Sequence, residues 1–311
     1  MKKKRGGSRT GSLLKSIKSN WILYAMLIPA IVWYLIFCYA PMGGVTLAFK
    51  DYQYNCGIFG SPWVGLQHFA QMFSDSEFWR ALANTLIFSF GKLVFHFPVP
   101  IIIAILLNEM RSPRAKKVFQ TIFTFPHFIS WVVLSGILIM MFSSNGIVNQ
   151  VLASLGMAEV APLMSLIAFR PFIWISQIWK EAGWDAIIYM AALTSIDPQL
   201  YEAADIDGAG RWQKMRYVTW PGIRSVVCIM LILQVGGIMG GACFDQIFNL
   251  YSAPVYEVAD IIDTYVYRLS FMTGSNFGYT TAVGLFKSVI GVILITVANK
   301  VVVKSGEEGL F

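Results

Sequence analysis

Apolar residues fall into six long blocks separated by more polar stretches. Each block is long enough to cross the hydrocarbon core of a bilayer as a helix, which takes about 20 mainly apolar residues. The blocks lack the alternation of polar and apolar positions that a membrane β-barrel requires. The pattern therefore predicts an all-α, polytopic membrane protein with about six transmembrane helices, at residues 21–41, 82–107, 118–142, 170–195, 221–241 and 280–303.

The composition agrees with lipid as the surrounding medium. Of the 311 residues, 56% are hydrophobic and 13% are charged, and the mean hydropathy is +0.61. A water-soluble domain carries about 25% charged residues. Because a soluble core of this size could not bury so much apolar surface, the composition excludes an ordinary soluble enzyme.

Lysine and arginine are distributed unevenly between the segments that connect the blocks. Residues 1–20 are rich in them and contain no acid, and further clusters lie at 111–117 and 211–224. Basic residues are retained on the cytoplasmic side, so we expect both termini to be cytoplasmic and the chain to lie in a plasma (inner) membrane. The same rule accounts for the net charge of +7 without nucleic acid as a partner. The only basic residues in the predicted outer segments are Lys50, Arg80, Arg170 and Arg268.

The chain divides into a basic cytoplasmic tail at 1–20, a transmembrane domain at 21–303 and a short cytoplasmic tail at 304–311. The first block exceeds the roughly 7–15 apolar residues of a removable signal peptide and is expected to remain as a helix. Cys56 and Cys243 both fall in predicted outer segments, so a disulfide and two unpaired thiols both remain open.

Prolines and glycines mark irregular or closely packed helices. Pro98 and Pro100 interrupt the second block, and Pro126 lies early in the third. Proline kinks a helix, and in lipid the freed carbonyl must find a partner inside the protein. These positions therefore predict either packing kinks or a water-filled path. Small residues that favour close helix packing recur in the last two blocks, at Gly236, Gly237, Gly240, Gly241, Gly284 and Gly291.

The longest inner segment, residues 196–220, predicts two short helices. Asp197 can cap the first helix, and Pro198 suits its first position. Gly208 can adopt a positive φ and end it, and a second helix from about 209 to 217 would be closed by Pro221. Helices this short are unstable without a partner, so the segment predicts a docking element on the cytoplasmic face.

The same segment carries a specific spacing. It reads Glu202-Ala203-Ala204, three residues, Gly208, nine residues, Val218, one residue, and then Trp220-Pro221. This spacing resembles the EAA motif of binding-protein-dependent ABC importer permeases. The motif usually has Ile at the position of Val218 and Leu at that of Trp220, so Trp220 is a real departure. It lies at the entry of the next helix and not in the docking turn.

The resemblance extends over about residues 21–303. Seven further stretches are similar to the carbohydrate-uptake branch of these permeases, of the polysaccharide or oligosaccharide type. They are residues 63–69, 84–86, 108–109, 125–131, 179–184, 189–193 and 263–268.

The resemblance implies a type I ABC importer permease fold and a transmembrane subunit that carries an oligosaccharide or polysaccharide fragment into the cell. It implies as partners a second homologous permease, two ATPase subunits and an extracytoplasmic solute-binding protein. This chain has no G-x-x-x-x-G-K-[ST] loop. We therefore expect no enzyme activity and no cofactor in it, with ATP and Mg bound by the partner ATPase. The residues implied to dock on the ATPase are Glu202, Ala203, Ala204, Asp207, Gly208 and Ala209.

Ionisable and aromatic side chains within the predicted helices form a candidate substrate path. Charged groups inside a bilayer are costly and are usually functional or paired. Tryptophan also suits interface belts and helix packing, so both interpretations of each aromatic residue stay open. No metal site is expected. The candidate path residues are His127, Trp131, Gln177, Trp179, Lys180, Trp184, Asp185, Tyr189 and Gln234.

Three other function classes were weighed against this interpretation. A membrane-embedded enzyme would need paired metal ligands or a nucleophile with its base, but His68, His96 and His127 lie far apart in the sequence. A passive channel would not need an ATPase-docking segment. A permease for a non-sugar solute, such as a peptide, would carry the same inner segment, and only the seven stretches similar to the carbohydrate-uptake branch argue against it.

Overall fold

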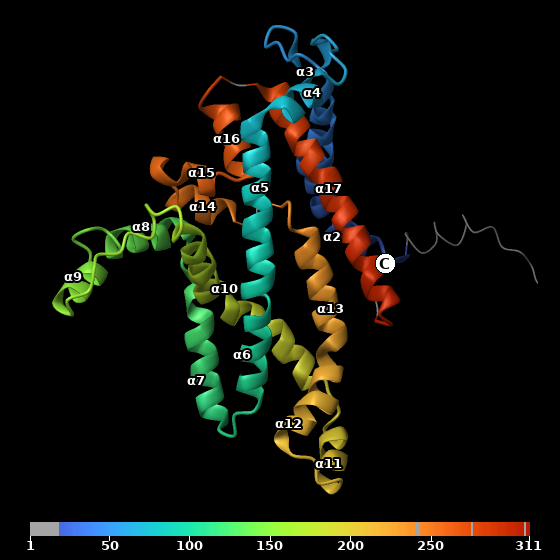
Figure 1. Cartoon of the computed structure of the whole chain (residues 1–311). Coiled ribbons are helices and arrows are strands. Elements are labelled where there is room, and N and C mark those ends of the chain that lie inside the picture. Colours follow the sequence, from blue (N-terminus) through green and yellow to red (C-terminus); the bar gives the residue numbers. More distant parts are fainter. Residues whose placement is uncertain (1–18, 241–242, 275, 308) are drawn as a thin grey trace, which may run out of the picture.

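The computed structural model describes residues 19–240, 243–274, 276–307 and 309–311. This part of the chain is helical, and its one β contact is an isolated bridge between Lys50 and Trp63. Figure 1 shows long helices running roughly along one axis, with shorter helices at both ends and beside them. The architecture confirms the predicted all-α fold class.

The helices differ widely in length. The longer ones are α2 (Trp21–Tyr34), α5 (Ser76–Gly91), α6 (Pro98–Asn108), α7 (Pro113–Thr124), α8 (Trp131–Met141), α10 (Phe169–Thr194), α13 (Trp220–Gly236) and α17 (Phe277–Lys304). The shorter ones are α3 (Gly57–Gly60), α4 (Gln67–Ser74), α9 (Ile147–Ser154), α11 (Pro198–Ile206), α12 (Arg211–Lys214), α14 (Phe244–Leu250), α15 (Tyr256–Ala259) and α16 (Ile262–Phe271). Wider π turns are η1 (Leu35–Tyr39), η3 (Lys92–His96) and η5 (Met215–Thr219); 3-10 segments are η2 (Ala40–Phe49), η4 (Phe125–Phe128) and η6 (Ala253–Val255).

Several of these helices are long and apolar enough to cross a membrane. Within the described residues four segments qualify: Trp21–Phe49, Ser76–Asn108, Arg211–Met239 and Phe277–Lys304. A fifth is added if the bent pair around α7 and α8 is one span. The multi-pass prediction is confirmed, whereas the count of six is not. Helix α10 has 26 residues but carries four charged side chains, Arg170, Lys180, Glu181 and Asp185.

The third predicted helix, 118–142, is not straight. The segments Pro113–Phe128 and Trp131–Met141 meet at 95°. Pro126 cannot donate a backbone hydrogen bond, Ile129 is extended, and Ser130 caps α8 by accepting from the Val133 N–H at 3.3 Å. The chain therefore turns away from the bundle here, and α8 and α9 extend sideways from its middle (Figure 1).

The prolines of the second block do not end its helix. The helical run continues from Ser76 to Asn108, with the π turn η3 placed just before Pro98. In this turn the Phe97 N–H donates to the Lys92 carbonyl at 3.1 Å, and Pro98 then occupies the first turn of α6. Because proline is tolerated at that position, the wider turn keeps the span continuous.

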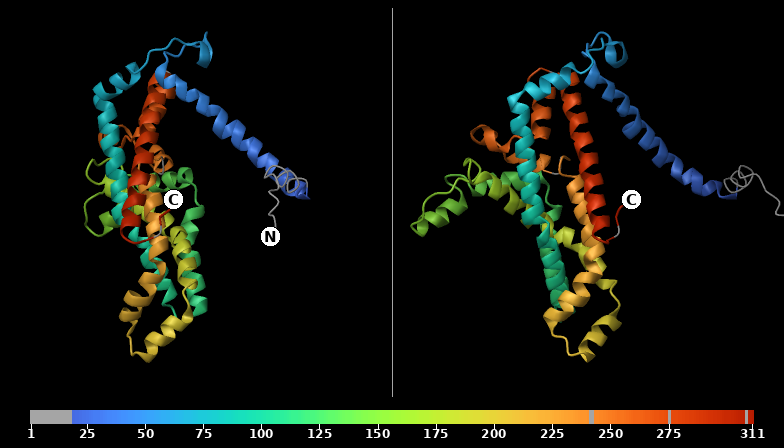
Figure 2. Two further views of the ribbon diagram at one scale, coloured as in Figure 1. Left: turned by 90° about the vertical axis from the view of Figure 1, so that its right-hand side faces the viewer. Right: turned by 45° about the vertical axis from the view of Figure 1, so that its right-hand side comes forward.

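Helix α2 separates from the rest of the bundle. None of its residues is buried, and both views of Figure 2 show it diverging from the other helices. The helical run continues to Phe49, past the predicted end at residue 41. An apolar helix that its own chain does not bury is left to face lipid or another subunit.

The bundle itself is held by three apolar clusters and by close helix crossings, one of them at Gly236. The clusters contain Phe78 and Tyr265, Phe88 and Phe169, and Ile101 and Tyr189, respectively. A side chain at Gly236 would lie 2.9 Å from Ile295, so a glycine there brings α13 close to α17, as predicted. Gly291 lies at the same crossing, since a Cβ there would be 3.7 Å from the Gly236 carbonyl oxygen. The remaining predicted positions differ: α13 ends at Gly236, nothing lies within 4 Å of a Cβ at Gly284, and Gly241 falls outside the described residues.

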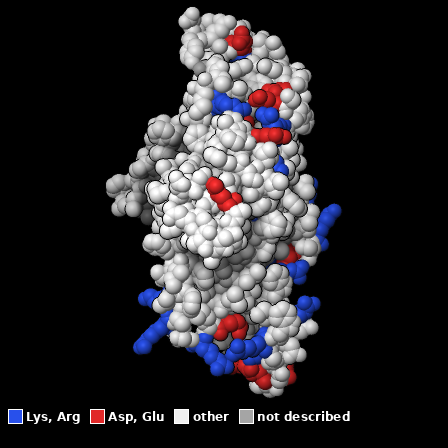
Figure 3. All heavy atoms as spheres, turned by 60° about the vertical axis from the view of Figure 1, so that its left-hand side comes forward, with Lys and Arg blue, Asp and Glu red and all other residues white. Residues whose placement is uncertain are grey.

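Charged side chains concentrate at the ends of the bundle. The predicted inner segments 108–117 and 196–220 lie at one end, and η2, α3 and α4 lie at the other (Figure 1). On the face shown in Figure 3, the basic side chains gather mainly at the lower end, and the surface between the ends is mostly uncharged. This grouping agrees with a membrane-embedded middle.

Two predicted outer segments differ from expectation. Residues 143–169 extend beside the middle of the bundle, as do α14 and α15 within 242–279 (Figure 1). Cys243 lines an internal pocket, Cys56 is exposed, and both are free thiols. The structure therefore gives no Cys56–Cys243 disulfide.

A hydrogen-bonded cap joins three helices at the end opposite the inner segments. The Asp75 carboxylate accepts from the hydroxyls of Tyr265 and Tyr279 at 2.5 and 3.0 Å and from the Glu77 N–H at 2.8 Å. Burial alone would raise the pKa of Asp75, but these donors outweigh it and lower the pKa below its ordinary value. The cap connects the start of α5 to α16 and α17.

Candidate functional site

The inner loop forms a capped helix at the end of the bundle. The Asp197 carboxylate accepts from the Gln199 N–H at 2.9 Å and caps α11. At the other end Gly208 has φ +72°. The Gly208 and Ala209 N–H groups donate to the carbonyls of Asp205 and Ala204 at 3.1 and 2.9 Å. These two bonds form a Schellman motif, which ends the helix as the sequence predicts.

The second half of the loop differs from the predicted separate helix. Helix α12 continues through η5 into α13, so one helical run extends from Arg211 to Met239. The π turn gives the Trp220 N–H the Met215 carbonyl as acceptor, just before the proline. Pro221 thus lies in the first turn of α13 and does not close the preceding helix.

The loop is braced from within and exposed on its outside. Tyr201 and Thr219 hydroxyls lie 3.0 Å apart, and Lys214 pairs with Asp205. Ile206 is 88% exposed and Trp212 is 72% exposed. Braced polar contacts combined with exposed apolar side chains are typical of a surface that another protein covers.

The predicted docking residues share this surface. Glu202, Ala203, Asp207 and Gly208 are exposed, and Ala204 and Ala209 are half-buried. They lie on α11 and its C-terminal turn, and their role as docking contacts stays a prediction. The residues predicted to dock on the ATPase do not include Ile206 and Trp212. For Ile206 the sequence offers a signal, because this apolar residue lies between Asp205 and Asp207.

Inside the bundle, the bend after α7 is held by a group of ionic contacts. The Lys180 ammonium donates to the His127 carbonyl at 2.9 Å and to Glu181 Oε1 at 2.7 Å. The other carboxylate oxygen of Glu181 lies 2.5 Å from His127 Nδ1. The side chains of Lys180 and Glu181 are 6% and 16% exposed. Each charge is thus paired, and η4 is fixed to α10.

Two tryptophans complete this group, which we call the Lys180 cluster (His127, Trp131, Lys180, Glu181 and Trp184). Trp184 stacks on the His127 ring at a centroid distance of 4.2 Å and an angle of 5°. The Lys180 Nζ lies 5.4 Å from the centre of the Trp131 ring, within cation–π range. The structure thus brings four predicted path residues together with Glu181.

The other predicted path residues lie elsewhere. Asp185 is 3.5 Å from His96 Nε2, and Gln177 and Tyr189 are buried along α10. Trp179 is 54% exposed on the outside of that helix. Gln234, from α13, lines a different pocket. The nine residues therefore do not form one continuous site.

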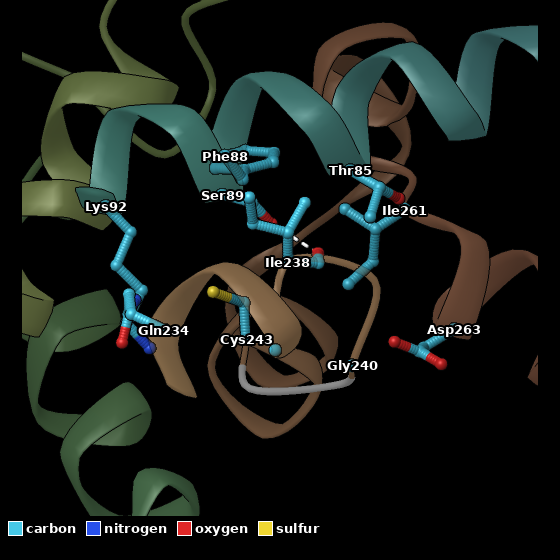
Figure 4. Close-up of a pocket in the computed structure, with 11 residues that line it drawn as sticks. Thr85, Phe88, Ser89, Lys92, Gln234, Ile238, Gly240, Cys243, Ile261 and Asp263 are labelled. Atoms are coloured by element: carbon cyan, nitrogen blue, oxygen red, sulfur yellow. Dashed lines mark hydrogen bonds between the residues drawn. The ribbon is translucent and has the colours of Figure 1, made fainter. Parts of the chain in front are cut away.

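The pocket beside Gln234 contains a lysine that the sequence interpretation left out of the path. Lys92 extends from η3 toward Gln234, and Asp263 lies at the opposite end of the pocket (Figure 4). A visible signal existed, because Lys92 stands in the middle of an apolar block and the positions three and four residues away, 88, 89, 95 and 96, hold no acid.

Comparison with known proteins identifies the family. Residues 96–304 match the model described as "Binding-protein-dependent transport system inner membrane component". The chain is 43% identical over 300 residues to the polygalacturonan/rhamnogalacturonan transport system permease protein YteP of Bacillus subtilis, covering 96% of this chain and 92% of that one. It is 42% identical over 301 residues to Protein LplB of the same organism, covering 96% and 94%.

A solved structure shares both sequence and fold. A chain in the crystal structure of a bacterial alginate ABC transporter, in complex with its alginate pentasaccharide-bound periplasmic protein, superposes with a TM-score of 0.87. It is 41% identical, and the match covers 96% of this chain and 99% of that one. Together with the capped inner loop and the apolar bundle, these matches show that the chain belongs to the family of binding-protein-dependent transport system inner membrane components, the permeases of ABC importers.

Proposed function

We propose that this chain is one of two permease subunits in an importer that moves an oligosaccharide or polysaccharide fragment into a bacterial cell. Two ATPase subunits drive the movement and bind ATP and Mg, and an extracytoplasmic protein delivers the saccharide. Both termini of this chain lie on the cytoplasmic side with the inner loop.

The inner loop is the observation that carries the proposal. A nine-residue helix, α11, protrudes at the end of the bundle with none of its residues buried. Its ends are nevertheless fixed by an Asx cap and a Schellman motif. An exposed, apolar and internally braced helix fits a rigid lever that transmits the movement of an ATPase to α13.

Helix α2 supports a second permease as partner. Its 14 residues are 13 apolar or aromatic residues and one proline, none of them is buried, and the helix diverges from the rest of the bundle (Figure 2). A homologous subunit at this face would cover it and would close the open side of the bundle. Lipid covers the remaining surface.

The relatives indicate which saccharides to test first. One is named for polygalacturonan and rhamnogalacturonan, and a second solved relative imports "the acidic polysaccharide alginate". Fragments of polymers that contain uronic acids are therefore the first class of candidate substrate.

The test substitutes each of two matched glycines by valine, in separate variants of the assembled importer. Gly208 has φ +72°, Gly156 has φ +70°, and nothing lies within 4 Å of a Cβ at either position. A side chain in this conformation costs about 1–2 kcal/mol, so Gly208→Val should reduce ATP-driven uptake roughly five- to thirtyfold, the factor that such an energy corresponds to. Gly156→Val carries the same local strain outside the loop and should leave uptake near the wild-type rate.

Uptake and ATP hydrolysis are measured in proteoliposomes with the two ATPases and the loaded binding protein. Equal uptake by the two variants would contradict the proposed coupling loop. Purification of this chain without any ATPase would contradict the importer itself.

A further inference from the structure

Lys92 occupies the centre of a membrane-spanning segment. The run Ser76–Asn108 has 33 residues, so 16 residues precede Lys92 and 16 follow it. At about 1.5 Å per residue, the backbone of Lys92 lies about 24 Å from either end. A lysine at this depth is costly in lipid, and such residues mark ligand or ion paths when they are not paired.

The described residues offer the Lys92 side chain no direct partner. Its ammonium makes neither an ion pair nor a hydrogen bond with them, although its charge acts on Asp185 from beyond contact distance. Two other lysines inside the bundle are paired: Lys180 with Glu181, and Lys287 with Asp263. Asp263 lies in the same pocket as Lys92 but at its far end (Figure 4), where Lys287 neutralises it.

The amide toward which Lys92 extends is also without a hydrogen bond (Figure 4). The side chain of Gln234 forms no hydrogen bond within the described part of the chain. In contrast, the hydroxyls of Ser89 and Thr85 donate to backbone carbonyls at 2.7 Å each. An ammonium and an amide thus remain as donors on one side of the pocket.

The backbone that carries Lys92 is held in place. A Cβ at Gly91 would lie 2.1 Å from the Trp174 ring, so the glycine lets α10 approach closely. The Trp174 indole N–H donates to the Phe88 carbonyl at 3.3 Å. Lys92 then begins the π turn η3, a feature that often occurs at functional sites. The lysine is thus presented by a fixed scaffold.

We propose that Lys92 and Gln234 form a mid-membrane site that binds the carboxylate of an acidic saccharide during translocation. The ammonium supplies the charge and the amide a second donor, which together suit a carboxylate. The pocket holds about 20 Å³, room for about one water-sized group. A space of this size can take one carboxylate oxygen but not a sugar ring, which would stay on the open side of the bundle. This proposal rests on the proposed saccharide importer function.

The test compares an acid with its neutral counterpart in the complete importer. The probes are a galacturonate pentamer, its methyl ester and a sulfated neutral pentamer, each at saturating occupancy of the binding protein. The ratio of acid to ester uptake reports on charge recognition, because a folding defect lowers both rates equally. We expect a ratio of at least tenfold for the wild type and a fall toward one in Lys92→Met, with Lys92→Arg and the neighbouring Val94→Met retaining the preference.

An unchanged ratio in Lys92→Met, or equal uptake of acid and ester by the wild type, would overturn the carboxylate site and leave the importer function intact. Lys92-dependent uptake of the sulfated pentamer without the galacturonate would overturn the choice of carboxylate. Failure of the wild type to transport any saccharide that its binding protein holds would contradict the proposed function instead. If Lys92→Met does not assemble, Gln234→Leu tests the same site, with a lowered ratio expected.

Discussion

Two lysines inside the same bundle have opposite surroundings. Lys180 is buried against Glu181, the His127 carbonyl and the Trp131 ring. Lys92 is half-buried beside a small pocket and makes no ion pair among the described residues. Both break the rule that charge avoids lipid, but only the first has its cost offset within the chain. The difference separates a lysine that holds the fold from one that is available to a ligand.

Substitution of the two lysines should give the largest contrast. Lys180→Met leaves Glu181 buried with one cationic partner fewer, and breaking a buried pair costs about 3–5 kcal/mol. Lys92→Met breaks no direct ion pair and should lower stability much less, although Asp185 loses a more distant positive charge. Thermal unfolding of the purified complex in detergent, followed by size-exclusion chromatography, measures both. If Lys92→Met proves as unstable as Lys180→Met, the distinction between the paired and the open lysine is wrong.

A second test concerns the close approach that brings α7 to the Lys180 cluster. A Cβ at Gly183 would lie 2.1 Å from the Phe123 carbonyl oxygen, so Gly183→Ala must push α7 away from α10. Overpacking of this kind costs about 1–3 kcal/mol. Gly284→Ala, where nothing lies within 4 Å, should be neutral or slightly stabilising, because alanine is the better helix former. Equal unfolding temperatures for the two variants would show that the crossing tolerates a side chain.

The sequence predicts features that depend on neighbouring residues far better than features that depend on distant ones. Apolar length predicts the spans around α2, α5, α13 and α17, and Asp197 and Gly208 predict both ends of α11. These signals are local, because propensity and capping act over a few residues.

The arrangement of the path could not be predicted in this way. The pairing of His127 with Glu181 joins positions 54 residues apart, and it depends on the packing of η4 against α10. The chain then bends by 95° between Phe128 and Trp131. Proline indicates a bend but not its angle, since neighbouring helices decide where the freed chain goes. The sequence indicates Gln234 and Trp131 equally as candidate path residues, yet the fold places them in different sites.

The smallest expected effect concerns the cap at Asp75, whose carboxylate is fully hydrogen-bonded but only half-buried, so that it can still exchange protons with solvent. Because its folded pKa is lowered, the cap contributes stability above the ordinary carboxyl pKa and loses it as the pH falls through the folded pKa. Asp75→Asn keeps an oxygen that can cap α5, but it removes the charge and replaces the oxygen that accepts from Tyr265 and Tyr279 with an amide NH₂. The loss of this acceptor costs about 1 kcal/mol at neutral pH.

The same substitution should flatten the fall in unfolding temperature between pH 6 and pH 3, because the asparagine has no proton to gain. Glu159→Gln, a substitution of an exposed acid, serves as the control and should keep the wild-type pH profile. An Asp75→Asn variant with an unaltered profile would assign the acid sensitivity to other carboxylates, such as the buried Asp260 paired with Arg268 at 2.8 Å. The hydrogen-bonded carboxylates of this chain would then fall into two classes: those whose protonation lowers stability in this pH range and those, like Asp75, whose protonation does not.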